Sequence, residues 1–154
     1  MGRRVSILAC MVAISAFAIV ANADDTPDPC SDTSCPVICG SGTAPCVVVL
    51  KRSKSSHTPV VSIKGTPAPL FCVASGTKVK WIVPATAKSI YALSFNPKHT
   101  PFSQSLFLGN GLHPFSDTAS NHGGTDRCYV YSFVICDGGK CQHADPRVVI
   151  NGGP

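Results

Sequence analysis

Nine cysteines are spread over this 154-residue chain, and eight of them follow an N-terminal apolar segment that contains Cys10. An even number of cysteines in a small exported chain is typical of a disulfide framework, which stabilises a domain whose core is small. We therefore predict that all eight form disulfides. They are Cys30, Cys35, Cys39, Cys46, Cys72, Cys128, Cys136 and Cys141.

The pairing of these cysteines is open, because eight cysteines can be connected in many ways. Cys136 and Cys141 flank Asp-Gly-Gly-Lys, a strong turn sequence, so we predict a disulfide that closes a hairpin there. The four cysteines between residues 30 and 46 are expected to pair largely among themselves. Zinc is the alternative for that cluster, but its spacing lacks the short paired knuckles of structural zinc sites.

Residues 1–23 have the pattern of a signal peptide. Arg3 and Arg4 precede an unbroken run of apolar and small residues, and Ala21-Asn22-Ala23 is a small-x-small cleavage site. We predict a secreted or periplasmic protein with no stable membrane anchor once this segment is removed. Loss of the two arginines lowers the formal net charge from +5 to +3. The remaining basic residues are scattered, apart from 51–54, which we interpret as a solvated hairpin end, so we expect no nucleic-acid partner.

The rest of the chain divides into two parts. Residues 24–45 are rich in Pro, Ser, Gly and Cys without periodicity, which predicts an irregular, disulfide-rich N-terminal extension. Residues 46–154 contain short segments of β-branched and aromatic residues between turn residues, and they sustain no helical period. This pattern predicts an all-β, two-sheet sandwich, in which the longest irregular stretch is a loop from Gly109 to Arg127. The expected strands are 46–52, 59–64, 70–75, 78–83, 89–95, 105–108, 128–136 and 147–150.

Alternation along 78–83 predicts which side of that strand is buried. Val79, Trp81 and Val83 share one face, while Lys78 and Lys80 share the other.

Segment 128–136 is apolar on both faces, which predicts a central strand. Its aromatic residues Tyr129, Tyr131 and Phe133 are expected in the core with Trp81. Another three aromatic residues lie near expected loops, where a cluster of partly exposed rings would form a partner-binding patch. They are Phe102, Phe107 and Phe115.

The order of these segments resembles that of cupredoxin-like β-sandwiches of secreted bacterial proteins. A buried strand precedes Gly76-Thr77-Lys78-Val79-Lys80-Trp81, a long variable segment follows, and Tyr129-Val130-Tyr131 comes next. The closing Asp145-Pro146-Arg147 and its three apolar neighbours are similar to the final strand of members that lack copper. The resemblance covers about residues 59–150 and implies a cupredoxin-like or immunoglobulin-like sandwich without a complete copper site.

A type-1 copper site needs two histidines, a cysteine thiolate and usually an axial methionine. Both methionines lie in the predicted signal peptide. Cys141, Gln142 and His143, with His99 upstream, are a partial ligand set, and Cys141 has a disulfide partner nearby. We therefore expect no cofactor, with copper or zinc binding as the alternative.

The best candidate for that alternative lies in the expected loop. His113 and Asp117 form one His-x3-Asp unit, and His122 and Asp126 form a second. Two imidazoles and two carboxylates suit Zn²⁺ or Cu²⁺. The competing interpretation is a polar surface loop in which both aspartates accept hydrogen bonds in turns.

Catalytic motifs are scarce in this sequence. The chain contains no Glu, and four of its eight Asp residues lie in the N-terminal extension, which leaves few carboxylates for acid–base catalysis. There is no Gly-x-Ser-x-Gly nucleophile motif. We therefore predict a non-enzymatic binding or structural module, whose partner is a protein or small ligand that the sequence does not identify.

Overall fold

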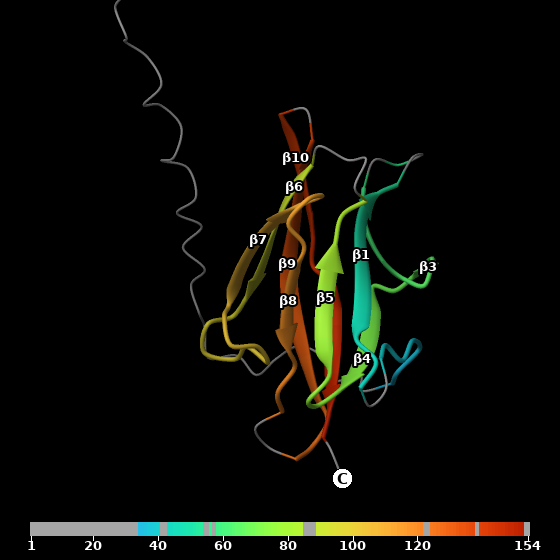
Figure 1. The fold of residues 1–154 in the computed structure, drawn as a ribbon, viewed down its shortest axis with the longest axis vertical. Coiled ribbons are helices and arrows are strands. Elements are labelled where there is room, and N and C mark those ends of the chain that lie inside the picture. The colour runs from blue at the N-terminus through green and yellow to red at the C-terminus, as the bar shows by residue number, and fades with distance from the viewer. Residues whose placement is uncertain are drawn as a thin grey trace, which may run out of the picture.

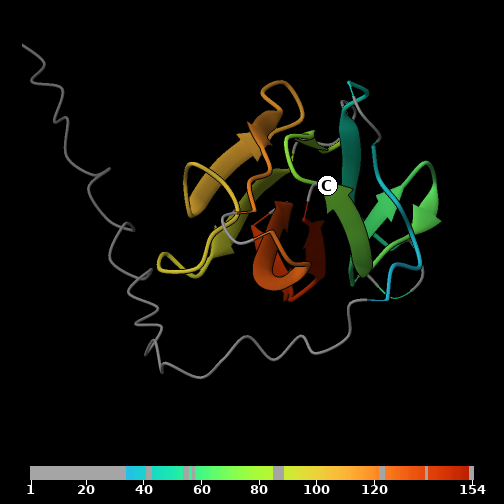
Figure 2. The same cartoon turned by 90° about the horizontal axis from the view of Figure 1, so that it is seen from below.

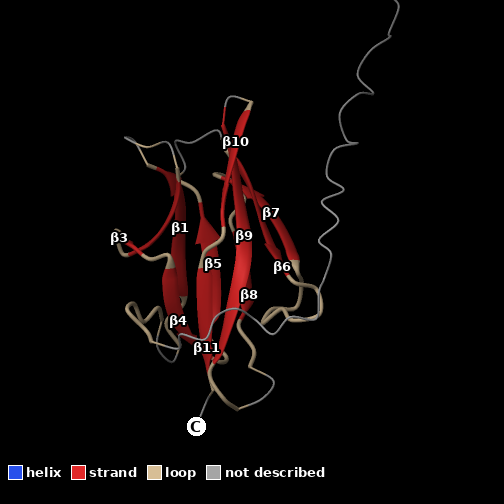
Figure 3. Ribbon diagram, turned by 180° about the vertical axis from the view of Figure 1, so that it is seen from behind, coloured by secondary structure: helices blue, strands red, loops and turns tan. Residues whose placement is uncertain are grey.

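A computed structural model describes residues 34–40, 43–53, 56, 58–84, 89–121, 124–137 and 139–152. The predicted signal peptide, residues 24–33 of the N-terminal extension with Cys30, and His122 all lie outside the described residues. The described part is all β, and Figure 3 draws its strands in red. It contains no helix with the length and apolar character needed to cross a bilayer.

The strands form two mixed sheets that pack together. The first sheet contains β1 (Cys46–Arg52), β2 (Pro59–Ile63), β3 (Thr66–Pro67), β5 (Lys78–Ile82) and β8 (Phe115–Thr118). The second contains β4 (Leu70–Ala74), β6 (Ile90–Phe95), β7 (Leu106–Asn110), β9 (Arg127–Asp137), β10 (Lys140–Ala144) and β11 (Arg147–Asn151). Their orders are β3-β2-β1-β5-β8 and β4-β11-β9-β6-β7, with β10 paired to β9. The pair β6–β7 lies at one side of the molecule and β2–β3 at the other (Figures 1 and 2).

Both sheets are mixed because each contains one parallel pair. β1 runs parallel to β5, and β4 runs parallel to β11, while the remaining neighbours are antiparallel. The alternation predicted for 78–83 is confirmed in β5, where Val79 and Trp81 are buried and Lys78 and Lys80 are exposed. The first sheet therefore presents an apolar face to the second, as sandwich packing requires.

β9 is the central strand of the second sheet, as its two apolar faces predict. β6 pairs with one side of it, and β11 and β10 pair with successive parts of the other side. Tyr131, Phe133 and Ile135 point into the core and are almost completely buried. The other face is less covered, since Val130 and Val134 are half-buried and Ser132 is exposed.

The core is built around Trp81. The Trp81 ring meets Phe102 edge-on at a centroid distance of 5.0 Å and stacks with Phe107 at 6.0 Å and with Phe115 at 5.6 Å. Phe102 and Phe107 are buried, and Phe115 is half-buried. The predicted patch of exposed rings is therefore wrong. The three rings do cluster, but they do so inside the sandwich, because β7 and β8 are strands whose inner faces carry Phe107 and Phe115.

Three strands are not predicted by the sequence pattern: β3, β8 and β10. β8 lies within the expected loop from Gly109 to Arg127, and β7 continues to Asn110, so the loop prediction is wrong for 109–110 and 115–118. β8 reads Phe-Ser-Asp-Thr and β10 reads Lys-Cys-Gln-His-Ala. β10 is polar and forms a strand through backbone pairing with β9, whereas β8 packs only Phe115 against the core and otherwise depends on backbone pairing with β5.

The disulfides confirm part of the predicted pairing. Cys136–Cys141 closes the β9–β10 hairpin as predicted, and Cys39–Cys46 pairs two members of the N-terminal cluster. Cys35 instead pairs with Cys72 of β4, 37 residues away, so the expectation of pairing within the cluster is wrong for Cys35. Cys128 is also disulfide-bonded. Disulfides of this number are typical of proteins that fold in an oxidising, extracytoplasmic compartment.

The pairing of Cys35 has a backbone cause. Residues 37–39 run alongside β4 instead of folding back on themselves: the Cys39 N–H donates to the Cys72 carbonyl at 2.8 Å, and the Cys72 N–H donates to the Val37 carbonyl at 2.9 Å. The described part of the N-terminal extension therefore covers the outer edge of β4.

Candidate functional site

The described members of the predicted metal set lie in three separate hydrogen-bonded settings. His113 is in the turn between β7 and β8, with its Nδ1 atom 3.2 Å from Asn110 Oδ1. Asp117 lies in β8, and Asp126 directly precedes β9. Among the described residues, no three or more His, Cys, Asp or Glu side chains are grouped so that they could hold a metal ion. His122, the fourth member, lies outside this part of the chain.

The Asp117 carboxylate fastens a loop to β8. One of its oxygens accepts hydrogen bonds from the backbone N–H of Ser103 at 2.8 Å and from the Ser103 hydroxyl at 2.6 Å. The other accepts from the Thr118 N–H at 2.7 Å. Both oxygens are thus engaged in structural contacts, although Asp117 lies in a strand and not in the turn that the sequence suggested.

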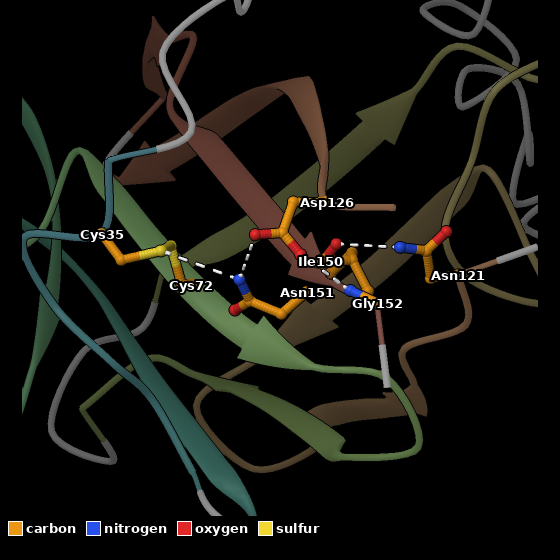
Figure 4. The surroundings of a disulfide bond; sticks show 7 residues. All are labelled: Cys35, Cys72, Asn121, Asp126, Ile150, Asn151 and Gly152. Atoms are coloured by element: carbon orange, nitrogen blue, oxygen red, sulfur yellow. Dashed lines mark hydrogen bonds between the residues drawn. A yellow bond between two sulfur atoms is a disulfide. The ribbon is translucent and has the colours of Figure 1, made fainter. Parts of the chain in front are cut away.

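The Asp126 carboxylate holds the end of β11. It accepts hydrogen bonds from Asn151 Nδ2 at 3.0 Å and from the Gly152 N–H at 2.9 Å. Asn121 donates to the Ile150 carbonyl at 3.1 Å from the other side. Figure 4 shows that this network lies beside the Cys35–Cys72 disulfide. Together these contacts fix the C-terminal strand to the segment that precedes β9.

Two residues of the partial copper-ligand set, Cys141 and Gln142, also make structural contacts. Cys141 is bonded to Cys136 and so presents no thiolate. Gln142 accepts a hydrogen bond from Arg52 Nε at 3.4 Å, which connects β10 to the β1–β2 hairpin. His143 is exposed on β10 opposite Val134.

A different feature stands out on the second sheet: an apolar outer face that sequence reasoning missed. Ile90, Leu106, Leu108 and Leu112 are 60%, 56%, 72% and 80% exposed. Leu106 and Leu108 lie opposite Ser94 and Ala92 of β6, and Ile90 lies opposite Asn110, so the first three side chains share the outer face of the β6–β7 pair. Contiguous exposed apolar side chains of this kind mark interaction surfaces. We call Ile90, Leu106, Leu108 and Leu112 the β6–β7 face.

One sequence signal points to this face. Leu106 and Leu108 flank Phe107, so the segment is apolar on both sides. Phe107 is buried, and an edge strand in a two-layer sandwich has one face in solvent, so the two leucines are left outside.

The inner side of the same strands is held firmly to the first sheet. The Tyr91 hydroxyl donates to the Trp81 carbonyl at 3.1 Å and accepts from the Phe115 N–H at 3.0 Å. Burial raises the pKa of this hydroxyl, and the Phe115 hydrogen bond partly offsets the increase. Gly109 lies opposite Tyr91, and a Cβ atom at this position would overlap the Tyr91 ring. Glycine is therefore required for Tyr91 to reach across the core.

A small cavity lies on the first sheet. Its volume is about 250 Å³, and its lining includes Val47, Val49, Ile63 and Lys64. Sites for drug-sized ligands are usually larger, roughly 300–1,000 Å³. The β6–β7 face is therefore the stronger candidate for a functional surface.

No protein-family model matches this sequence, and no curated protein matches it either. The two-sheet sandwich is established by the structure, whereas the resemblance to cupredoxin-like proteins stays a prediction.

Proposed function

We propose that this chain is a secreted or periplasmic module that binds a partner without catalysis, and that it binds through the β6–β7 face. The observation that supports the proposal is an exposed apolar surface on a sandwich cross-linked by disulfides. Its residues are Ile90, Leu106, Leu108 and Leu112. Exposed apolar side chains gain free energy when a partner removes them from water. A scaffold that is already rigid loses little conformational entropy on binding.

The chemistry of the described polar residues supports a non-catalytic role. Acid–base catalysis needs a carboxylate or imidazole that is available to a substrate. Asp117 and Asp126 both accept hydrogen bonds from neighbouring backbone and side-chain groups. Their carboxylates serve to fix loops and strand ends.

Site-specific photo-cross-linking in cells that export the protein tests this function. A photoreactive amino acid placed at Leu112 is expected to give covalent adducts, because this residue is 80% exposed in the turn that follows β7. The matched control carries the same amino acid at Lys80, which is exposed on the other sheet. Adducts from both positions in equal amounts, or none from Leu112, would contradict binding through the β6–β7 face.

A further inference from the structure

Among the described residues, β7 is the least protected strand edge of this sandwich, because on its outer side only Asn110 is paired, with His113 in the following turn. Native proteins protect free edges with short strands, prolines, charges or a covering segment, because an exposed edge pairs with other chains. β3 has two residues, one of them Pro67, and β8 is short and carries Asp117. β4 is covered by residues 37–39, and β10 carries Lys140 and is cross-linked to β9. β7 reads Leu-Phe-Leu-Gly-Asn and, among the described strands, pairs with β6 alone.

The register shows which backbone groups of β7 face outward. The Phe95 N–H donates to the Ser105 carbonyl at 2.7 Å, so Phe95 and Ser105 form a hydrogen-bonded pair. Such pairs alternate along an antiparallel ladder, so Phe107 and Gly109 also bond to β6. The N–H and carbonyl groups of Leu106 and Leu108 therefore point away from the sheet.

These groups are complementary to a second copy of the same strand. We propose that two copies of this chain pair antiparallel through β7, about a two-fold axis at Phe107. This inference rests on the proposed binding function and identifies a second copy of the chain as the partner. In this register Leu106 lies opposite Leu108 of the partner subunit, and Leu108 lies opposite Leu106 of the partner subunit. Each pair exchanges two backbone hydrogen bonds and places two leucine side chains together on the outer face. A register centred on Leu108 is less suited, because it needs the Asn110 N–H, which already donates to the His113 carbonyl.

The charge pattern also favours a second copy. Residues 99–116 contain no Asp, Glu, Lys or Arg, although the whole chain has a formal net charge of +5. In a two-fold contact a charge on the axis meets an identical charge, so an uncharged edge suits self-pairing. A strongly acidic or basic partner would find no countercharge along this strand.

The oligomeric state of the exported, oxidised protein tests the pairing. Sedimentation equilibrium from about 1 µM to about 1 mM covers the range of weak and moderate interfaces. We expect a concentration-dependent monomer–dimer equilibrium. Leu108→Lys is expected to weaken it at least about tenfold, because it places a charge next to the axis and removes both leucine pairs. Ile38→Lys is the matched control, since Ile38 is as exposed as Leu108 but lies beside β4, at the opposite edge of the second sheet, and its dimer is expected to remain.

Hydrogen exchange of the Leu106 and Leu108 amides distinguishes the possible outcomes. Slow exchange that appears only at high protein concentration supports the pairing. Slow exchange at every concentration would show that another segment of the same chain covers β7, and fast exchange at every concentration would show a bare edge; either result overturns the pairing. If photo-cross-linking from Leu112 captures a different protein while the purified protein stays monomeric, the binding function stands and the self-pairing is wrong.

Discussion

Replacing Tyr91 by Phe removes one oxygen atom that connects the two sheets. This hydroxyl comes from β6 and lies between the facing backbone groups of Trp81 and Phe115, which are cross-strand neighbours in β5 and β8. Phenylalanine keeps the ring and its packing. The change therefore tests the two hydrogen bonds while leaving the apolar core almost unaltered.

The expected effect follows from the two backbone groups that lose their partner. A buried donor or acceptor without a hydrogen bond destabilises a protein by about 1–3 kcal/mol, and the loss of the desolvated hydroxyl offsets part of the sum. We expect Tyr91→Phe to lower the free energy of unfolding by about 2–3 kcal/mol. For a domain of this size such a change lowers Tm by about 6–12 °C.

Urea unfolding of the oxidised protein measures this change directly. The chain has one tryptophan, so its fluorescence follows the core around Trp81. Tyr131→Phe is the matched control, because it removes the same atom from the same core. Neither the Tyr131 hydroxyl nor the Trp81 Nε1 group has a hydrogen-bond partner within the described residues. Removing the Tyr131 hydroxyl should therefore leave stability unchanged or raise it by about 1 kcal/mol. Equal effects of the two substitutions would refute the assignment of Tyr91 as a connection between the sheets.

Three further predictions concern pH, the disulfides and a glycine. Burial raises the pKa of the Tyr131 hydroxyl above the ordinary value of 10.0. Because the folded state then holds the proton more tightly than the unfolded state, this group leaves stability unaffected below pH 10 and lowers it as the pH rises further, so urea unfolding of Tyr131→Phe should show a smaller alkaline loss of stability than the wild type. Replacing both Cys35 and Cys72 by Ala should lower the free energy of unfolding by about 4 kcal/mol, and replacing both Cys136 and Cys141 should lower it by about 2 kcal/mol. The difference is expected because the two disulfides span 37 and 5 residues, and a longer closed loop restricts the unfolded chain more. Equal losses in urea titrations would contradict this entropic origin of the stabilisation. Gly109→Ala should lower Tm by at least about 3 °C in thermal unfolding, because the added methyl group overlaps the Tyr91 ring; an unchanged Tm would show that the ring can move aside.

The strands that the sequence predicted are those that contribute side chains to the core. The expected segment 46–52 coincides with β1, and 59–64, 70–75 and 78–83 differ from β2, β4 and β5 by one residue. Their alternation arises from burial, which the sequence encodes directly. β8 contributes Phe115 alone to the core, and β10 is polar. Both strands depend mainly on backbone pairing with β5 and β9, which leaves no hydrophobic period in the sequence.

The disulfides and the candidate surface also show that features which depend on contacts between distant segments are not predictable from the local sequence. The Cys136–Cys141 bridge was predictable because a local turn brings the two residues together, whereas Cys35 and Cys72 meet only once residues 37–39 lie along β4. Similarly, a strand that is apolar on both faces reads as central. Nothing within residues 105–108 shows that one face of this strand is uncovered, so the exposure of Leu106 and Leu108 became evident only from the structure.

The inner and outer contacts of β7 support each other physically. Phe107 stacks on Phe115 with ring centroids 3.9 Å apart, and Gly109 admits the Tyr91 ring whose hydroxyl binds the opposite sheet. An edge strand that lacks such inner contacts frays, and ordering it would oppose any partner that pairs with it. Because β7 is already fixed from inside, the proposed pairing requires little further ordering of its backbone, and the exposed leucines gain more of the free energy of burial. The placement of Phe107 and Gly109 is thus what makes an unprotected edge suitable for specific binding.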